Sequence, residues 1–382
     1  MSAAPAAPLV LCVVGARPNF VKMAPILAAF AALQPPIRVS LVHTGQHYGV
    51  AMDGQFFSAL SLPMPDVNLG VGSGSHAEQT ANIMLRFEPV LDQLAPAAVL
   101  VVGDVNSTLA CALVACKMAV PVIHVEAGLR SLDRAMPEEI NRILTDQMSA
   151  LLLTSEPCGA LNLLCEGIAA EHIHEVGNVM IDSLRRHLHE ATPVASLLAN
   201  GGRPHLLHAG RGYAVLTAHR PANVDDPREL ERLFALVHAV AARLPVILPL
   251  HPRTRARLTA GGRLGLLDHP GLMITEPLGY LDMLGAMRDA QVLITDSGGV
   301  QEEALVLGVP CITLRDSTER PSTLEAGGNV LVGNDSAMAL ATLDAVLGGA
   351  HRPGPPPASW DGQAATRIAQ RTRAWLAERS GA

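Results

Sequence analysis

The stretch Val292–Glu303, Val-Leu-Ile-Thr-Asp-Ser-Gly-Gly-Val-Gln-Glu-Glu, places an apolar, strand-like run directly before a Ser297-Gly298-Gly299 turn and the start of a helix. Glycines let backbone N–H groups approach an anion closely, and the first turn of a helix adds unpaired donors and partial positive charge. Glu303, one turn later, is placed to accept from ribose hydroxyls. Alternatively, Ser297 simply caps the helix and the glycines serve packing. The stretch predicts a strand, a helix and a phosphate seat between them.

Apolar runs of this kind recur along the chain and alternate with helical stretches, which is typical of parallel sheets with crossover helices. The runs are Leu9–Val14, Val39–His43, Ala98–Gly103, Val122–Val125, Leu151–Thr154, His174–Val176, Ala214–Thr217, Val246–Leu250, Leu272–Thr275, Val292–Thr295 and Cys311–Leu314. Because 382 residues exceed the usual size of one core, we expect an α/β protein with two doubly wound, Rossmann-like domains facing a central cleft.

The expected domains are residues 1–180 and 181–362, since the composition changes between Arg185 and Tyr213, where we place the interdomain linker. Pro353–Pro357 reads as a further linker. The amphipathic stretch after it, within residues 363–382, is expected to form a helix that packs back on the first domain.

Composition excludes several classes of function. The net charge is −7 without a basic run, so nucleic acid is not an expected partner. The longest apolar stretch, Ala95–Val125, is too polar and broken to span a membrane, and Met1–Val14 lacks the pattern of a signal peptide. We therefore expect a cytoplasmic protein with no membrane partner.

The cysteines and histidines of the chain lack the spacing that is typical of metal sites. Six cysteines show no C-x-x-C pair and fifteen histidines show no H-E-x-x-H motif. We expect buried free thiols, no metal and no other cofactor. Lysine is nearly absent. The chain has only Lys22 and Lys117, and its other permanently positive side chains are arginines. A lysine kept in such a sequence suggests a point-charge role, although an indifferent surface position is the alternative.

Three carboxylates follow predicted strands or open a helix in the first half: Asp104, Glu126 and Glu138. Each also has a structural interpretation, in which Asp104 caps a helix near Asn106, Glu126 pairs with Arg130, and Glu138 favours a helix N-terminus after Pro137. Together, at one sheet edge, they would be able to divide acid and base roles.

The second half adds His219 and His251 at the ends of successive predicted strands, where ligands of open α/β sheets bind. Arg320 follows a further strand and would reach a phosphate or ribose. A surface ion-pair loop is the alternative for Arg320.

Seven motifs, in order along nearly the whole chain, resemble those of the non-hydrolysing UDP-N-acetylglucosamine 2-epimerases. They are Gly15–Pro25, Gly103–Thr108, His124–Arg130, Met136–Arg142, Thr217–Arg220, Asp296–Glu303 and Thr318–Pro321. The resemblance implies a GT-B-like fold, a homodimer, no metal, and reversible conversion of UDP-GlcNAc to UDP-ManNAc for polysaccharide biosynthesis. In that family UDP is eliminated to give 2-acetamidoglucal and then added back after C2 is reprotonated on the other face.

The resemblance also assigns residues. Catalysis would use Asp104, Glu126, Glu138 and His219, with the acid and base roles of the carboxylates left open. The substrate would contact Asp104, Glu126, His219 and further residues of both halves: Arg17, Lys22, Leu278, Met283, Ser297, Gly298, Gly299, Glu303 and Arg320.

The sequence departs from the family at three places. Asn19 replaces a glutamate of many members, and Met283 stands, beside Leu278, where some members brace the uracil with phenylalanine. The motif Gln46–Gly49 lacks a second glutamine that helps bind an activating UDP-GlcNAc, so allosteric activation is not expected.

Three rival functions remain on the sequence alone: C2 epimerisation of a UDP-2,3-diacetamido uronic acid, transfer of a sugar by a GT-B glycosyltransferase, and sensing of a UDP-sugar. A transferase would share the Ser-Gly-Gly seat but would need an acceptor groove and no carboxylate cluster. A sensor would not need ionisable groups at the strand ends.

Overall fold

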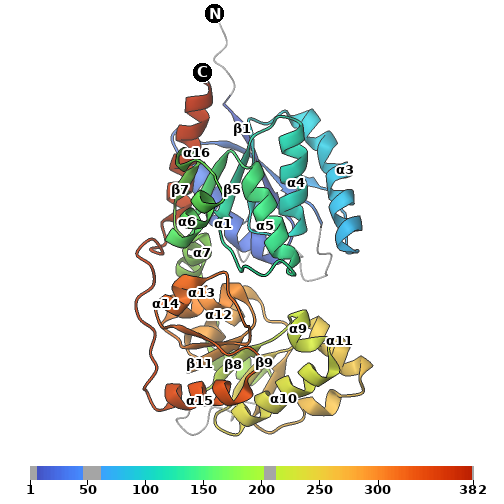
Figure 1. Cartoon of the computed structure of the whole chain (residues 1–382), viewed down its shortest axis with the longest axis vertical. Helices are drawn as coiled ribbons and strands as arrows, with labels where there is room; N and C mark the ends of the chain where they lie inside the picture. Colours follow the sequence, from blue (N-terminus) through green and yellow to red (C-terminus); the bar gives the residue numbers. More distant parts are fainter. Residues whose placement is uncertain (1–6, 46–61, 202–211, 381–382) are drawn as a thin grey trace, which may run out of the picture. The chain divides into compact units, whose positions relative to one another are not determined.

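The chain forms two compact units in a computed structural model that describes residues 7–45, 62–201 and 212–380 (Figure 1). The first unit comprises residues 1–183 and 358–382, and the second comprises residues 184–357. The division falls inside helix α7 (Val179–His187), and the chain leaves the second unit at the end of Pro353–Pro357.

The first unit is built on a seven-stranded parallel sheet of order β3-β2-β1-β4-β5-β6-β7. The strands are β1 (Leu9–Val14), β2 (Arg38–His43), β3 (Val67–Asn68), β4 (Ala98–Val102), β5 (Val122–Ala127), β6 (Leu151–Thr154) and β7 (Ile173–Glu175). The central strands are apolar throughout because helices cover both faces. All five residues of β4 are buried.

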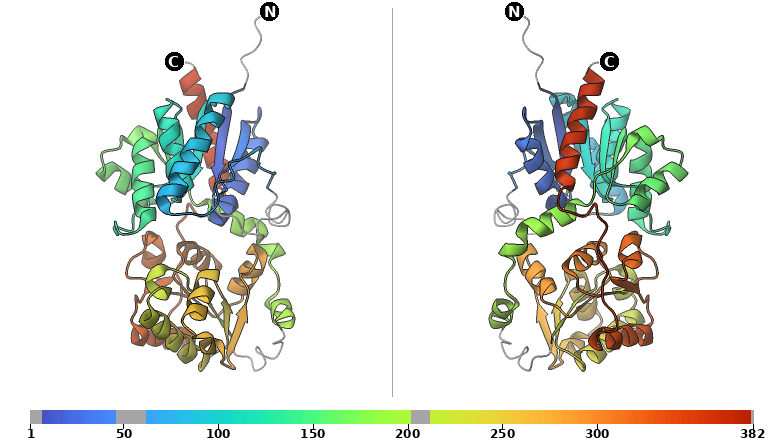
Figure 2. Two further views of the ribbon diagram at one scale, coloured as in Figure 1. Left: turned by 90° about the vertical axis from the view of Figure 1, so that its right-hand side faces the viewer. Right: turned by 90° about the vertical axis from the view of Figure 1, so that its left-hand side faces the viewer.

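The helices of the first unit follow its strands. They are α1 (Arg17–Ala32), α3 (His76–Leu94), α4 (Asn106–Lys117), α5 (Pro137–Met148), α6 (Pro157–Cys165), the short η2 (Ala170–His172) and α16 (Ala364–Ser380). A capping box opens α3, where the Ser75 hydroxyl accepts from the Glu78 backbone and the Glu78 carboxylate accepts from the Ser75 backbone. The C-terminal helix α16 packs against α1 (Figures 1 and 2).

The second unit has a six-stranded parallel sheet of order β10-β9-β8-β11-β12-β13. Its strands are β8 (Ala214–Thr217), β9 (Val246–Pro249), β10 (Leu272–Thr275), β11 (Val292–Thr295), β12 (Cys311–Thr313) and β13 (Asn329–Leu331). In both sheets the strand order reverses beside the first strand of the unit, which is the switch point where doubly wound folds bind ligands.

Helices lie on both faces of the second sheet as well (Figure 2). They are η3 (Leu188–Glu190), α8 (Val194–Asn200), α9 (Pro221–Val224), α10 (Pro227–Ala241), α11 (Pro252–Ala260), η5 (Leu264–Leu267), α12 (Tyr280–Arg288), α13 (Gly298–Leu307), α14 (Pro321–Glu325) and α15 (Ser336–Leu347). One face is covered by a core that includes Phe234 of α10 and Leu343 of α15, and the other by a core that includes Leu198 and Leu284.

The predicted α/β class with two parallel sheets is confirmed, and the differences are local. Strands β3 and β13 were not expected, and each is only two or three residues long. The segment Arg185–Tyr213, expected as a linker, contains η3 and α8, and Leu197 and Leu198 are buried in a core. Cys116 and Cys165 are exposed, so the expectation of buried thiols holds for Cys12, Cys111 and Cys311 but not for these two. No helix of the described residues is long and apolar enough to cross a membrane.

Candidate functional site

In the first unit, Asp104 lies just beyond β4 and is held by an arginine of α5. Arg142 Nη2 lies 2.5 Å from Asp104 Oδ2, and Asn141 of the same helix donates to the Asp104 backbone carbonyl at 2.8 Å. Helix α4 is capped by Val105 without a side-chain bond, so the interpretation of Asp104 as a helix cap is wrong. The Asp104 side chain is about one third exposed, at 30%, and so remains accessible to a ligand.

Glu126, at the end of the neighbouring strand β5, pairs with Lys22 of α1 rather than with Arg130. Its backbone has φ of +71°, the left-handed region that is strained for a residue other than glycine, and the pairing of β5 with β6 is irregular there. Gly103 lies against this ion pair, because a Cβ at that position would be 3.5 Å from Lys22 Nζ and 3.6 Å from Glu126 Oε2. The ends of β4 and β5 therefore bring the two carboxylates together with Lys22.

Of the two glutamates that open α5, only Glu138 is available for chemistry. Glu139 is buried, where it accepts from the Ser131 backbone and hydroxyl and from the Leu132 backbone, and it pairs with Arg142 at 2.6 Å. Within the described residues the half-buried Glu138 makes no hydrogen bond or ion pair. Glu138 and Arg142 are four residues apart on one face of α5, so Glu138 lies on the helix face that holds Asp104.

In the second unit, α13 begins at the Ser297-Gly298-Gly299 turn beyond β11, as predicted. Ser297 occupies the N-cap position, but its side chain makes no capping bond, which contradicts the interpretation of this serine as a cap. The donors of the first turn therefore point past the serine toward the carboxyl edge of the sheet.

Arg320 belongs to a buried group of charges beside that turn. Its guanidinium pairs with Glu302 at 2.8 Å and with Glu319 at 3.6 Å, and Glu319 also pairs with Arg315 at 2.7 Å. A Cβ at Gly298 would lie 2.6 Å from Glu319 Oε1, so glycine there also lets this carboxylate approach α13. Arg320 is thus buried within the protein rather than lying in a surface loop, and it balances two glutamates at the seat.

Glu303 is deeply buried in α13, next to Tyr280 at the start of α12. Burial raises the pKa of Glu303 to about 7, and the Tyr280 hydroxyl opposes that rise. Leu278 and Met283 are partly buried against the same core on either side of Tyr280. A carboxyl group, a phenol and two apolar side chains thus come from neighbouring positions of α12 and α13.

His219, beyond β8, is oriented by Asp296 beyond the adjacent strand β11. His219 Nδ1 lies 3.1 Å from Asp296 Oδ1, while Oδ2 accepts from the backbones of His219 and Arg220 and from Asn223. Burial alone would raise the pKa of Asp296, but these hydrogen bonds outweigh it and lower the pKa to about 2. His251 stacks on the His219 ring with centroids 4.8 Å apart. The partly exposed His219 is therefore left with Nε2 for a ligand.

Two sequence predictions fall outside the described part of the structure. Arg17 is the first residue of α1, but its side chain is not described. The motif Gln46–Gly49 lies within residues 46–61, which are also outside the described residues.

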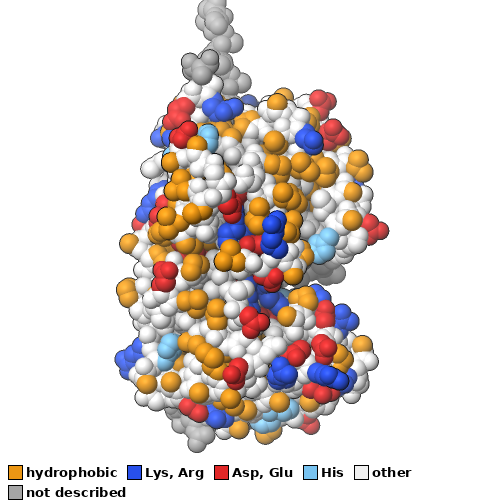
Figure 3. All heavy atoms as spheres, viewed as in Figure 1, with side chains coloured by type: hydrophobic (Ala, Val, Ile, Leu, Met, Phe, Trp, Pro, Cys, Tyr) orange, Lys and Arg blue, Asp and Glu red, His pale blue; other side chains and the backbone are white. Residues whose placement is uncertain are grey.

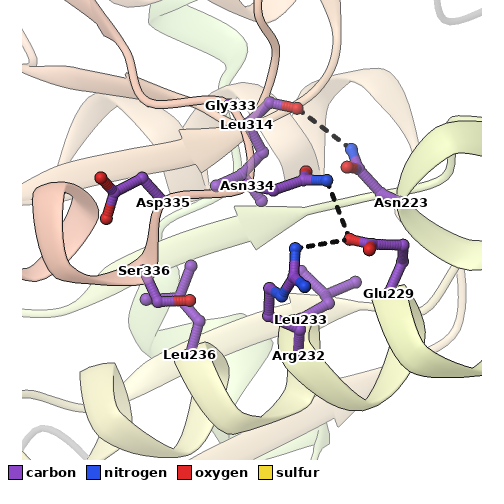
Figure 4. A pocket seen from close by; sticks show the side chains of 10 residues that line it. All are labelled: Asn223, Glu229, Arg232, Leu233, Leu236, Leu314, Gly333, Asn334, Asp335 and Ser336. Carbon is purple, nitrogen blue, oxygen red and sulfur yellow. Dashed lines mark hydrogen bonds and ion pairs between the residues drawn. The ribbon is translucent and has the colours of Figure 1, made fainter.

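Two hollows of the described surface are lined by none of the predicted site residues, although Asn141 lines one and Asn223 the other. A groove of about 570 Å³ runs between α3, α4 and α5, where hydrophobic side chains gather in Figure 3, and its lining includes Ala81, Met84 and Ile140. In the second unit a cavity of about 20 Å³ lies between Asn223, Glu229 and Asn334 (Figure 4). That volume suits about one water molecule and excludes a nucleotide.

The two units therefore offer different functional groups. The first offers carboxylates beside a lysine, which can remove and return a proton. The second offers helix donors, a histidine and a buried carboxyl group, which suit a phosphorylated ligand bearing hydroxyls. Among the described residues no group of three His, Cys, Asp or Glu side chains is placed to hold a metal ion.

Three polar residues that contact these groups were not among the predicted site residues: Asp296, Asn19 and His124. Asn19 accepts from the Ala16 backbone at 3.0 Å and donates to Val102 O at 2.9 Å, so it ties α1 to β4. Each of the three stands inside a quoted motif. The signal for His124 and Asp296 was a polar residue within or directly after an apolar strand, and Asn19 in α1 carried no such signal.

Comparison with known proteins gives the family. A family model described as UDP-N-acetylglucosamine 2-epimerase matches residues 31–373. A relative with that name from Methanocaldococcus jannaschii is 42% identical over 340 residues, 88% of this chain and 91% of that protein. A UDP-2,3-diacetamido-2,3-dideoxy-D-glucuronate 2-epimerase from Pseudomonas aeruginosa is 40% identical over 342 residues, 89% of this chain and 92% of that protein.

Solved structures agree with the sequence matches. The crystal structure of the Methanocaldococcus jannaschii UDP-GlcNAc 2-epimerase, in complex with UDP-GlcNAc and UDP, superposes with a TM-score of 0.85 at 39% identity, over 96% of this chain and 99% of that one. With a family match over most of its length and relatives at this identity, the chain belongs to the UDP-N-acetylglucosamine 2-epimerase family.

Proposed function

We propose that the protein interconverts UDP-GlcNAc and UDP-ManNAc as a non-hydrolysing 2-epimerase. The observation that carries the proposal is that Asp104 and Glu126 lie at the ends of the adjacent strands β4 and β5, with Lys22 paired to Glu126. A glycosyltransferase needs no such cluster, whereas inversion at C2 needs one group to remove a proton and another to return it. The activity in the names of the relatives supports the same choice.

The proposed reaction begins with loss of UDP. A carboxylate of the set Asp104, Glu126 and Glu138 takes the proton from C2 while the C1–O bond breaks, and the electron pair of that bond leaves on the β-phosphate oxygen. The products are 2-acetamidoglucal and UDP. In the second half, UDP oxygen adds back to C1 while a carboxylic acid on the other face gives a proton to C2. Because the C2 proton is weakly acidic, cleavage of the C1–O bond has to run ahead of proton removal. The enzyme therefore has to stabilise the negative charge on the departing diphosphate.

The diphosphate would be held by Ser297, Gly298 and Gly299 at the start of α13, with Arg17 and His219 as further donors. Asp296 directs the Nδ1 side of His219 inward, so Nε2 is the nitrogen that would donate to the leaving oxygen. Arg320 would act indirectly. Its positive charge neutralises Glu302 and Glu319, so that these carboxylates do not repel the phosphates bound at the Ser297-Gly298-Gly299 turn.

The nucleoside would be held by Glu303 and by the apolar side chains near it. Ionised Glu303 would accept from the ribose hydroxyls, which replaces the unfavourable burial of a charge by hydrogen bonds. Leu278 and Met283 would pack against the uracil. Lys22 would remain the partner of Glu126 and thus belong to the proton-transfer side of the site.

A second substrate is favoured by one specific observation. The Pseudomonas aeruginosa relative named for UDP-2,3-diacetamido-2,3-dideoxy-D-glucuronate is nearly as similar as those named for UDP-GlcNAc. The chemistry at C2 is the same for both sugars. The ratio of kcat/KM for the two UDP-sugars decides between them, and a ratio in favour of the uronate overturns the choice of UDP-GlcNAc.

We propose further that the protein is a homodimer that acts in the cytoplasm, in polysaccharide biosynthesis. The apolar groove of α3, α4 and α5 supports the dimer, because Leu85 of α3 is 68% exposed and Leu144 of α5 is 46% exposed beside it. Exposed apolar side chains that continue an apolar groove are typical of an interface between subunits.

Proton exchange at C2 tests the activity. The protein is incubated with UDP-GlcNAc in D₂O, and NMR follows deuterium at C2 and the appearance of the manno product. Asp104→Asn and Glu138→Gln are expected to bind UDP normally but to lose exchange, whereas Asp92→Asn, which changes an exposed carboxylate of α3, keeps it. An unreacted sugar with the wild-type protein rejects the epimerase, and normal exchange in both site variants rejects the carboxylate assignment.

A further inference from the structure

A fully buried histidine and aspartate lie beneath the two strand ends that carry Asp104 and Glu126. His124 is in β5, two residues before Glu126, and Asp146 is in α5, and neither side chain is exposed. His124 Nδ1 lies 2.6 Å from Asp146 Oδ1, and His124 Nε2 lies 2.9 Å from the backbone carbonyl oxygen of Gly103.

The partners fix how the imidazole is used. A carbonyl oxygen can only accept, so Nε2 carries a proton and donates it to Gly103 O. Asp146 is ion-paired with Arg130 through Oδ2 at 2.7 Å, and as a carboxylate it also only accepts. With two acceptors as partners, the ring therefore donates at both nitrogens, from a fully buried position.

The two bonds of the pair end on the backbone beside each proposed catalytic carboxylate. Gly103 immediately precedes Asp104, and its φ of +69° turns the chain out of β4. On the other side, Asp146 Oδ2 accepts from the Gly128 backbone at 3.1 Å, two residues after the strained Glu126. One buried pair thus fastens both turns.

The far end of the pair is anchored as well. Arg130 is buried, donates to Glu166 through two nitrogens at 2.7 and 2.6 Å, and donates to its neighbour's carbonyl, Leu129 O, at 2.7 Å. Asp146 is therefore held by an imidazole, a guanidinium and a backbone N–H at once.

We propose that His124 and Asp146 are positioning residues that set the placement of the Asp104 and Glu126 carboxylates relative to each other, and so control proton transfer at C2. The inference rests on the proposed function. Neither residue touches the substrate. Their effect is expected in kcat and not in the binding of UDP, because the UDP seat of α13 belongs to the second unit and the pair contacts only the first.

The test compares His124→Gln and Asp146→Asn with the wild-type full chain. Both variants are expected to lower kcat and C2 deuterium exchange by about 10- to 100-fold while KM and the Kd for UDP stay within about twofold, since small displacements of catalytic groups cost that much rate. The double variant should be no slower than His124→Gln, because the two residues act as a unit. Selective ¹⁵N-histidine NMR should show both His124 nitrogens protonated in the wild type and one deprotonated in Asp146→Asn.

Thr145→Val is the matched control, because Thr145 is a buried neighbour on α5 whose hydroxyl, within residues 7–45, 62–201 and 212–380, bonds only to Asn141 O at 2.7 Å. It should keep wild-type kcat when all variants are assayed well below their unfolding midpoints. Wild-type kcat in either pair variant, an equal loss in Thr145→Val, or an unprotonated Nε2 in the wild type overturns the proposal. Absence of C2 exchange in the wild type rejects the proposed function instead. The ¹⁵N NMR measurement then still tests the hydrogen bonds of His124, because it does not require activity.

Discussion

Asp296 holds His219 by three separate bonds, one to the ring at 3.1 Å and two through the backbone of His219 and its neighbour Arg220. Asp296→Asn should lower kcat about 100-fold, because an amide can donate to Nδ1 and so change which ring nitrogen carries the proton. UDP affinity should change much less. Thr217→Val is the control, since it removes a hydroxyl two residues from His219 that bonds Thr295 instead. Equal kcat in Asp296→Asn and wild type would remove His219 from the mechanism.

The two lysines of the chain offer a matched comparison. Lys22→Gln removes the positive charge that pairs with the buried Glu126 carboxylate, and we expect a loss of about 3–5 kcal/mol in the free energy of unfolding together with loss of epimerisation. Lys117→Gln changes an exposed residue at the end of α4 and should stay within about 0.5 kcal/mol of the wild type. Urea unfolding measures the first quantity and NMR of the products the second. Wild-type stability in Lys22→Gln would contradict the importance of the pair.

Glu303 predicts a pH dependence of stability. Its folded-state pKa of about 7 lies above the ordinary value of 4.5, so the folded state binds the extra proton, and stability is lost as the pH rises from 4.5 through 7. Glu303→Gln removes that loss and should stabilise the unliganded protein by up to about 3 kcal/mol at pH 8, with little difference at pH 4. The same variant should bind UDP about 10- to 100-fold more weakly. Thermal unfolding across pH and calorimetry with UDP check both, and a stability difference independent of pH would refute the assignment.

The exposed leucines of α3 and α5 beside the apolar groove predict the assembly state. If the proposed dimer forms through this groove, Leu85→Glu and Leu144→Glu should convert it to a monomer in light scattering, because each would bury a charge in the interface. Leu264→Glu, at a leucine of the second unit that is as exposed as Leu144, should leave the mass unchanged. A monomeric wild type, or dimers that survive both groove substitutions, would move the interface elsewhere.

The strand-to-helix connection at Val292–Glu303 shows what local sequence can predict. Residues Val292–Thr295 form β11 because Val292, Ile294 and Thr295 are β-branched and favour a strand, and the glycines that follow end the apolar run where α13 opens at Gly298. Strands β3 and β13 were missed because two or three residues are too few to show an alternating pattern. They form because they pair with the neighbouring strands β2 and β12.

Side-chain partners were less predictable than elements. Spacing suggested Arg130 as the partner of Glu126, but Lys22, 104 residues away in sequence, takes that place because α1 lies beside the ends of β4 and β5. Asp296 was visible as part of a motif. Its hold on His219 depends on the pairing of β8 with β11, which brings together residues 77 apart. Such partners follow from the order of strands in a sheet, which neighbouring residues do not encode.

The left-handed backbone of Glu126 has a consequence for protein engineering. A glutamate in that conformation costs about 1–3 kcal/mol, which glycine at the same place would recover, but that substitution would also leave the buried Lys22 charge unbalanced at a cost of about 3–5 kcal/mol. A library selected for heat tolerance alone should therefore enrich glycine at position 126 only together with an uncharged residue at position 22. Such variants would be more stable and inactive, so selection for stability has to be combined with selection for activity at these two positions.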